Sequence, residues 1–174
     1  MNAKKRFALS LAAFLFTAAA AWANVNTDYD RNANFAQYKT YSWGKIQTAD
    51  GLWNDRIKAA VDSRLAANGW TEVPSGGEVI VAARDAIHNE QQLNTFYDGF
   101  GGRRRFGSFG TATTTVDNYK VGTLLVELFD GHSKNLIWRG TASDTLSNNS
   151  DKNIRTLDKN VEKMFGHFPP QTKK

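Results

Sequence analysis

The chain has no cysteine among its 174 residues, and this absence excludes several classes of protein at once. Disulfide-stapled domains, enzymes with a thiolate nucleophile, and zinc or iron–sulfur sites held by cysteine are all ruled out. A bacterial lipoprotein carries its lipid on a cysteine at the mature N-terminus. The sequence therefore predicts that this protein is not a lipoprotein.

Long hydrophobic runs are also missing, except at the N-terminus. Residues 4–6 are basic, residues 7–20 are almost entirely apolar, and the run ends in Ala-Trp-Ala, the small-x-small pattern that signal peptidase requires. A membrane span needs roughly 20 consecutive apolar residues, and this stretch is shorter. We expect residues 1–23 to be a signal peptide cleaved between Ala23 and Asn24, which leaves an exported, soluble periplasmic protein without a transmembrane segment.

A strong net charge is the third absence. The formal charge of +5 includes the three cations of residues 4–6, so the mature chain carries only +2. Nucleic-acid binding usually needs a wide basic surface, and the sequence predicts no nucleic-acid partner. A mature chain of roughly 150 residues is one domain by the usual size prior and buries about 68–70% of its unfolded surface. We expect a single domain over residues 24–170 and a solvated tail at 171–174.

Histidine is scarce, which limits the catalytic chemistry that the sequence suggests. His88, His132 and His167 are far apart in the chain, and none lies in a nucleophile motif such as G-x-S-x-G. His88 and Glu90 would share one face of a strand, but no residue is indicated as a third metal ligand. We therefore expect a protein that is not an enzyme and has no catalytic residues, metal or cofactor. A hydrolase whose site is formed by convergence in a deep pocket remains the alternative.

Two stretches have the apolar spacing of amphipathic helices. The first covers residues 52–69 and ends at Asn68-Gly69, where glycine suits a C-terminal cap. The second begins near Ile154 and ends before Pro169 and Pro170.

Extended segments surround these helices. They cover residues 34–43, 70–73, 78–87, 111–119, 121–130 and 136–143. The Asp130-Gly131 turn predicts that the last two form a hairpin. The order of elements favours an α+β fold, a two-layer sandwich in which two helices pack on one face of a largely antiparallel sheet.

Residues 96–110, FYDGFGGRRRFGSFG, combine glycines, aromatic residues and three adjacent arginines. Guanidinium groups can grip phosphates, and the aromatic rings can stack or insert into an interface. One hypothesis is a contact with anionic lipid or polysaccharide phosphate, and the other is a long glycine-rich connection between strands. The candidate binding residues are Arg103, Arg104, Arg105, Phe100, Phe106 and Phe109.

Five short segments, spread over the whole mature chain, resemble the DUF4136 family of bacterial envelope proteins of unknown function. They are Asp28-Tyr-Asp30, Tyr38-Lys-Thr-Tyr-Ser-Trp43, Gly122-Thr-Leu-Leu-Val126, Leu136-Ile-Trp-Arg-Gly-Thr-Ala142 and Phe168-Pro-Pro170. The resemblance implies a protein of the cell envelope, but it supplies no activity and no catalytic residues. Members of the family often have a variable glycine- and aromatic-rich stretch before the G-T-L strand, which favours the connecting-loop interpretation of residues 96–110.

The residues of these segments suggest structural roles. We expect Trp43 and Trp138 to be packed strand aromatics and Arg139 to pair with a neighbouring acid. Gly140 indicates a bulge or a close approach of another chain segment.

Three functions remain open from the sequence. The first is a non-catalytic binding or interaction module of the cell envelope that contacts an anionic envelope component or another envelope protein. The second is an envelope-acting hydrolase with an unrecognised site. The third is a structural role through oligomerisation, which would require an exposed apolar face or an open sheet edge.

Overall fold

The computed structural model describes residues 24–98 and 111–170 of the chain. The elements are β1 (Asn24–Tyr29), the 3-10 helix η1 (Phe35–Gln37), β2 (Thr40–Gln47), α1 (Leu52–Ala67), β3 (Thr71–Glu72), β4 (Val79–Asp98), β5 (Thr111–Asp130), β6 (Leu136–Thr145) and α2 (Ser150–Met164). The expected signal peptide, the expected C-terminal tail and residues 99–110 of the expected loop lie outside the described residues.

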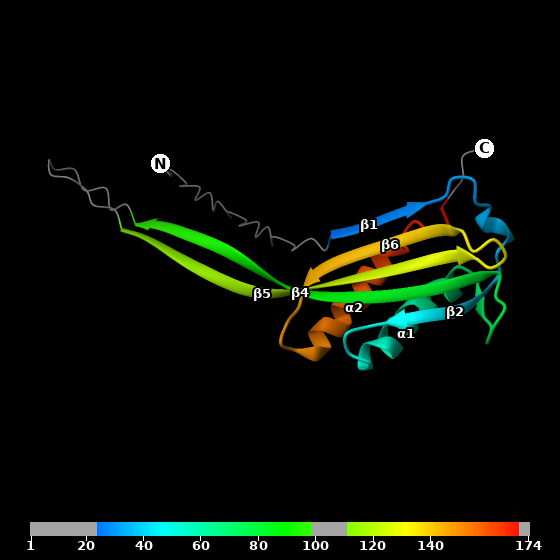
Figure 1. Ribbon diagram of the computed structural model, residues 1–174, viewed down its shortest axis with the longest axis horizontal. Coiled ribbons are helices and arrows are strands. Elements are labelled where there is room, and N and C mark those ends of the chain that lie inside the picture. The colour runs from blue at the N-terminus through cyan, green and yellow to red at the C-terminus, as the bar shows by residue number, and fades with distance from the viewer. Residues whose placement is uncertain (1–23, 99–110, 171–174) are drawn as a thin grey trace, which may run out of the picture.

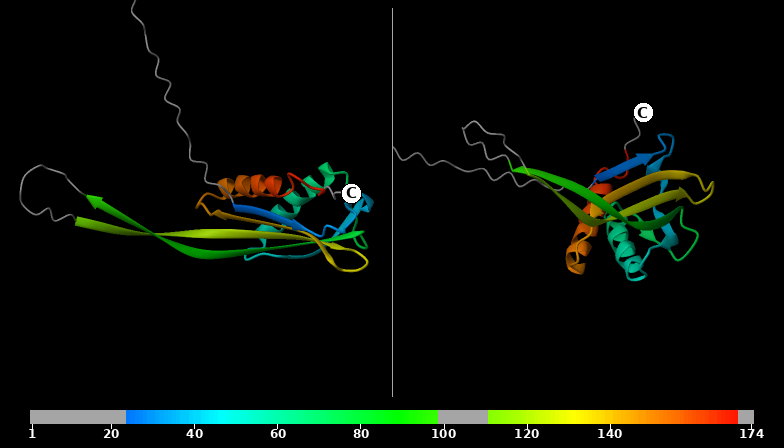
Figure 2. Two further views of the ribbon diagram at one scale, coloured as in Figure 1. Left: turned by 90° about the horizontal axis from the view of Figure 1, so that it is seen from above. Right: turned by 60° about the vertical axis from the view of Figure 1, so that its left-hand side comes forward.

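All six strands belong to one sheet, in the order β1-β6-β5-β4-β2-β3 (Figure 1). Neighbouring strands are antiparallel, except that β2 runs parallel to both β3 and β4. The helices α1 and α2 lie on the same face of the sheet and pack against each other (Figure 2). The predicted two-layer α+β architecture is confirmed.

The core lies between this sheet face and the two helices. Val81 and Ala83 of β4 are directly opposite Leu128 and Val126 of β5, and all four side chains are buried. The helices complete the core with buried residues at intervals of three and four: Ile57, Val61 and Leu65 from α1, and Leu157, Val161 and Met164 from α2. Each of the larger aliphatic side chains contributes about 1.5–3 kcal/mol by its burial.

A cluster of aromatic rings closes one end of the core. Phe168 has its ring centroid 5.2–5.8 Å from those of Phe35, Trp70, Trp138 and Phe165. All four contacts are edge-to-face, the arrangement that the ring quadrupole favours. The C-terminal Phe-Pro-Pro segment therefore belongs to the core, and Trp138 is buried as the sequence predicted.

The edges of the sheet differ from the sequence-based prediction. The strand expected at residues 34–43 is replaced by η1 and by β2, which begins only at Thr40 and continues to Gln47. Strand β1 was not predicted, because its sequence NVNTDY has no alternation of apolar residues and five of its six residues are exposed. It forms the edge of the sheet by pairing with β6.

The two longest strands extend well beyond the rest of the sheet. Pairing of β2 with β4 ends at Arg84, and pairing of β6 with β5 ends at Val121. From Asn89–Lys120 to Asp98–Thr111, ten residue pairs of β4 and β5 have no third strand beside them in the described part of the chain. We call these residues, 89–98 and 111–120, the arm. At about 3.4 Å per residue its length is about 34 Å. It projects from the rest of the domain, which we call the body, in all three views (Figures 1 and 2).

Candidate functional site

The arm is polar on both of its faces where it leaves the body, at residues 89–92 and 117–120. Directly opposed residues of antiparallel strands point to the same side, so Asn89 and Lys120 share the face that the helices cover in the body. Their side chains, and those of Gln91 and Asn118 on the same face, are exposed. Farther along this face, Val116 is apolar and has 48% of its surface exposed, and its partner in the ladder is Leu93. Next to the body the arm is thus a polar ribbon that offers its backbone edges to a partner.

A chain of hydrogen bonds ties the two strands together where the arm begins. His88 Nε2 lies 3.0 Å from Glu90 Oε1, and the hydroxyl of Tyr119 donates to Glu90 Oε2 at 2.9 Å. The hydrogen bond from Tyr119, followed by that from His88, lowers the pKa of Glu90, and the same carboxylate raises the pKa of Tyr119. His88 and Glu90 thus share a strand face, as predicted.

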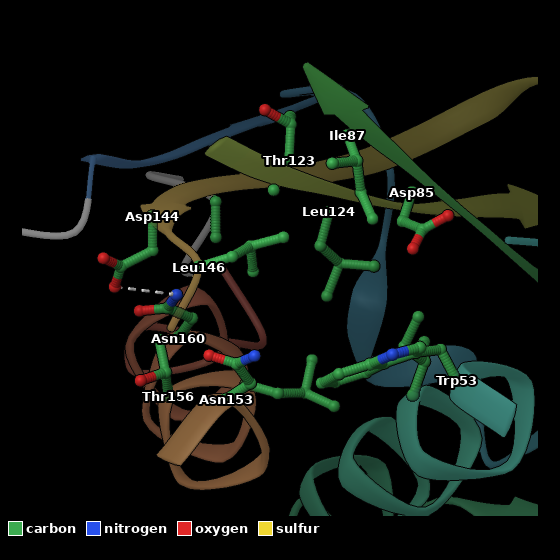
Figure 3. Close-up of a pocket in the computed structure, with 14 residues that line it drawn as sticks. Trp53, Asp85, Ile87, Thr123, Leu124, Asp144, Leu146, Asn153, Thr156 and Asn160 are labelled. Atoms are coloured by element: carbon green, nitrogen blue, oxygen red, sulfur yellow. Dashed lines mark hydrogen bonds between the residues drawn. The ribbon is translucent and has the colours of Figure 1, made fainter. Parts of the chain in front are cut away.

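A cavity of about 140 Å³ lies in the body, at the root of the arm. It is bordered by α1, α2 and the ends of β4, β5 and β6 from which the arm projects (Figure 3). Apolar residues form most of its wall: Trp53 and Ile57 of α1, Ile87 of β4, Leu124 of β5, Ala142 of β6, Leu146 and Leu157.

Polar groups line two sides of the cavity. Asp144 at the end of β6 accepts a 3.5 Å hydrogen bond from the amide of Asn160, which is 7% exposed and belongs to α2 (Figure 3). Thr156 lies on the same helix, and Asp85 of β4 lies on the opposite side of the cavity, where it accepts a hydrogen bond from the backbone of Ala49. The cavity is therefore an apolar hollow with two carboxylates in its lining.

Sequence reasoning did not identify this cavity. One signal for it was present: Asn160 interrupts the apolar stripe of α2 between Leu157 and Met164, at a position that the helical spacing places inside. A polar residue at a buried stripe position is informative, because burying an amide is unfavourable unless it finds a partner.

The candidate binding residues Arg103, Arg104, Arg105, Phe100, Phe106 and Phe109 lie outside the described residues. They belong to the segment of twelve residues, 99–110, that joins the two strands of the arm. Their role in binding therefore stays a prediction.

The three histidines lie on separate elements and are all exposed. His88 belongs to β4, His132 to the turn between β5 and β6, and His167 follows α2. In the described ranges, no three or more histidine, aspartate or glutamate side chains are grouped as a metal site requires.

Several polar residues of the family-like segments hold the body together. Tyr41 and Trp43 of β2 both donate to Asp62 Oδ1 of α1, at 2.8 and 2.7 Å. Burial, and next the hydrogen bond to Asp62, raises the pKa of Tyr41. Asp62 also pairs with Lys58 at 2.7 Å. These contacts fix α1 on the sheet.

The face of the sheet away from the helices carries an ion-pair group. Arg139 contacts Glu127 Oε1 through Nε at 3.0 Å and through Nη2 at 2.6 Å, and Arg84 lies 3.8 Å from the other carboxylate oxygen. The predicted pairing of Arg139 with an acid is thus observed. The group joins three neighbouring strands, since the residues belong to β6, β5 and β4.

Comparison with known proteins identifies the family and the fold. The family described as "Domain of unknown function (DUF4136)" matches residues 25–170, which confirms the resemblance seen in the sequence. No curated protein matches the chain. Among the part of the chain that the structure describes, no helix is long and apolar enough to span a bilayer.

Two solved structures share the fold. A PDZ domain protein from Parabacteroides distasonis has a TM-score of 0.57 at 12% identity, over 87% of this chain and 36% of that one, so the chain spans about a third of that protein. The PelC dodecamer from Paraburkholderia phytofirmans has a TM-score of 0.50 at 12% identity, over 82% of this chain and 95% of that one. At such identities the likeness concerns the fold.

Lipoprotein GNA1162 from Neisseria meningitidis is a more distant structural neighbour. Its TM-score is 0.42 at 11% identity, over 74% of this chain and 99% of that one.

Proposed function

The chain belongs to the DUF4136 family, and on this premise we propose that it is an exported binding module of the cell envelope whose arm makes the contact. The proposal includes cleavage of the signal peptide between Ala23 and Asn24 and a periplasmic location. It assigns the protein no catalytic step. Its partner is another envelope component, either a protein or an anionic polymer or lipid.

The observation that carries the proposal is the arm itself. A two-stranded ribbon alone is marginally stable at best in water. Ten unsupported pairs contribute little to the body, because the described side chains beyond Ile87 are almost all exposed. A segment that projects about 34 Å from the core is unfavourable to order by itself. Contacts with a partner along its edges or at its end offset this cost.

The residues that join the two strands of the arm, 99–110, indicate the chemistry of the partner. Arg103, Arg104 and Arg105 are adjacent, and Asp98 is the nearest acid in the sequence. Guanidinium groups bind phosphate and carboxylate oxygens in a bidentate manner, so an anionic partner suits this segment. The salt dependence of binding then reports whether these charges take part.

Two further observations favour binding over the hydrolase alternative. The histidines are exposed on three separate elements. The cavity at the root of the arm is lined mainly by apolar side chains, and none of the three histidines is among its lining residues. Nothing specific supports the hydrolase as a second candidate.

Assembly with copies of the same chain is one form that binding can take. PelC, which shares the fold at 12% identity, is a dodecamer in its crystal structure. For this chain, self-assembly belongs to the proposal.

The test compares three versions of residues 24–174 in co-sedimentation with isolated cell-envelope fractions across a salt series. The first is unchanged, and the second has residues 89–120 replaced by Asn-Gly, which closes His88 and Val121 in a two-residue hairpin turn. The third has Arg103, Arg104 and Arg105 changed to alanine.

We expect the arm-less version to lose binding while it keeps the circular dichroism and cooperative unfolding of the parent. Loss in the arginine version as well, together with salt sensitivity, would identify an anionic partner. Retained binding without the arm would contradict the proposal.

A further inference from the structure

We propose that the cavity at the root of the arm receives a phenylalanine side chain from residues 99–110 of a second copy of the chain. We call residues 99–110 the tip and the cavity with its lining residues the root, so that copies join tip to root. The inference rests on the proposed binding role of the arm and names a second copy as its partner. It follows from the size of the cavity, the charges of the two surfaces, the reach of residues 99–110 and the open access to the cavity.

The cavity has the size and the lining that an aromatic ring needs. An apolar cavity of about 150 Å³ in another protein holds a benzene molecule, and the hollow here is about 140 Å³. Its wall offers the aliphatic residues Ile57, Leu124 and Leu157, with the ring of Trp53 on the α1 side. Aromatic pairs with centroids 4.5–7 Å apart gain roughly 0.5–1.5 kcal/mol beyond burial.

The charges of the two surfaces are complementary. The lining includes the carboxylates of Asp85 and Asp144 and no basic residue. Segment 99–110 contains three arginines and no acid, and each of its phenylalanines lies within one to four positions of the nearest arginine. A ring in the hollow therefore brings guanidinium groups near these carboxylates. Arg56 already lies near the cavity, because it stacks on the Trp53 ring at 5.0 Å. This single positive charge does not balance the two carboxylates of the lining.

Reach requires that the ring come from another copy. Ile87 lines the cavity, and eleven residues of β4 separate it from the end of the strand at Asp98, about 36 Å of extended chain. A segment of twelve residues anchored at both ends extends about half its contour length, or roughly 20–23 Å, from its anchors. Segment 99–110 is therefore too short to reach the cavity of its own chain.

Access to the cavity is open on the side of the arm. Ile87 is 45% exposed although it is a large aliphatic residue in the lining. It marks the point where the covered face of the sheet becomes the uncovered face of the arm. A side chain that approaches along this face covers Ile87 as it enters the hollow, so exposed apolar surface is removed from water.

A contact of this kind uses different surfaces on the two copies. Each chain offers one tip and one root, and such heterologous contacts generate rings when the rotation closes and filaments when it does not. Both outcomes need every copy to have both surfaces intact, which supplies a decisive test.

The test uses sedimentation velocity on purified residues 24–174 and two complementary variants. The root variant carries Ile87→Arg, which places a cation at the mouth and is tolerated because the site is exposed. The tip variant carries Phe100, Phe106 and Phe109 changed to alanine. We expect the parent to assemble, each variant alone to stay monomeric, and an equimolar mixture to form a one-to-one dimer and nothing larger.

The matched control is Val116→Arg. Val116 is 48% exposed on the same face of the hairpin as Ile87, and it does not line the cavity. This variant should assemble like the parent. Equal loss of assembly from Val116→Arg and Ile87→Arg would overturn the inference, because it would show a general effect of charge on the arm.

A second measurement does not depend on assembly. A synthetic peptide of residues 96–110 is titrated into the isotope-labelled tip variant and followed by NMR. We expect shifts of the Trp53 indole and of the Leu146 and Leu157 methyl groups, which line the cavity, and no such shifts when Ile87→Arg is added. Shifts caused by a short-chain alkyl detergent but not by the peptide would assign the hollow to an apolar ligand and overturn the inference.

The two proposals fail separately. A monomeric parent that ignores the peptide overturns the inference, and the proposed function stands if the arm-less version still fails to bind envelope fractions. Envelope binding that survives arm deletion overturns the proposed function, even where the purified chains assemble.

Discussion

Single residues of the family-like segments have identifiable roles in the packing of the body. Gly140, in the Trp-Arg-Gly segment, lies where Met164 of α2 meets the sheet. A Cβ atom added there would collide with the side chains of Met164 and Trp138. Of the two roles that the sequence suggested for this glycine, the close approach is the one observed, since its pairing with Val126 is regular.

Replacing Gly140 with alanine should therefore destabilise the protein by about 1–3 kcal/mol, the usual cost of overpacking a core. Urea denaturation of the mature chain measures the change. The control is Gly51→Ala, because Gly51 has ordinary helical dihedral angles and no atom within 4 Å of an added Cβ. Equal stability of the two variants would contradict this account of Gly140.

Asp130 stabilises the turn between β5 and β6 through its charge. Its carboxylate accepts hydrogen bonds from the backbone N–H of Ser133 and of His132 and from the hydroxyl of Tyr38, at 2.7 to 3.0 Å. These bonds, with that from the Ser133 backbone first, lower the pKa of Asp130 to about 2. A carboxyl group whose pKa is depressed in the folded state stabilises the fold above its unfolded pKa and loses this effect as the pH falls.

Asp130→Asn should lower the free energy of unfolding by about 1–2 kcal/mol at neutral pH. The gap between parent and variant should narrow as the pH falls from about 4 to about 2, because Asp130 of the unfolded parent becomes protonated there while that of the folded parent is still charged. Urea denaturation at several pH values tests both statements. A gap that stays constant over this range would show that the charge of Asp130 is not the stabilising feature.

At the scale of elements, the strength of the local pattern decided what could be predicted. The helices α1 and α2 were predicted because apolar residues recur at helical intervals. The β5–β6 hairpin was predicted because the Asp130-Gly131 turn lies between two extended segments. Strand β1 and the arm half of β4 were missed, since most of their residues are polar and their few apolar residues do not alternate regularly. Residues such as Asn89, Gln91 and Gln92 are no more typical of a strand than of a loop.

The arm should be the least protected part of the sheet in the isolated monomer. Its backbone ladder is continuous with that of the body, but its described side chains, at residues 89–92 and 114–120, bury almost nothing. Local opening is easiest where apolar contacts are few. We expect amide hydrogen exchange at residues 89–92 and 114–120 to be at least about tenfold faster than at residues 79–86. Mass spectrometry of a dilute sample measures this, and uniform protection along β4 would contradict it.

At the scale of the whole molecule, the candidate cavity shows the limit of reasoning from sequence. Its walls come from two helices and three strands, so no window of the chain contains them together. Trp53 and Leu157 belong to the two stretches that were correctly predicted as amphipathic helices. Their position beside a hollow depends on how α1 and α2 diverge over the sheet, which no local pattern encodes.

The body should unfold as a unit that is independent of the arm. The five longer strands and both helices contribute residues to one core, and the aromatic cluster around Phe168 closes it. Calorimetry of the arm-less version should show a single transition with a midpoint within about 3 °C of the parent, since a change of 1 kcal/mol moves the midpoint of a domain of this size by roughly 2–4 °C. A second transition, or a much lower midpoint, would mean that the arm is part of the folding unit.

Because the register of β4 and β5 is unbroken, the number of residues in the arm sets the distance between the body and a partner at its end. Removing one residue from each strand would shorten it by about 3.4 Å and turn the tip to the opposite face, because successive residues of a strand alternate in direction. Only the removal or addition of two pairs keeps the orientation of the tip. Related chains that preserve the same contact can therefore differ in arm length only in steps of about 7 Å, and the spacing between body and partner is quantised.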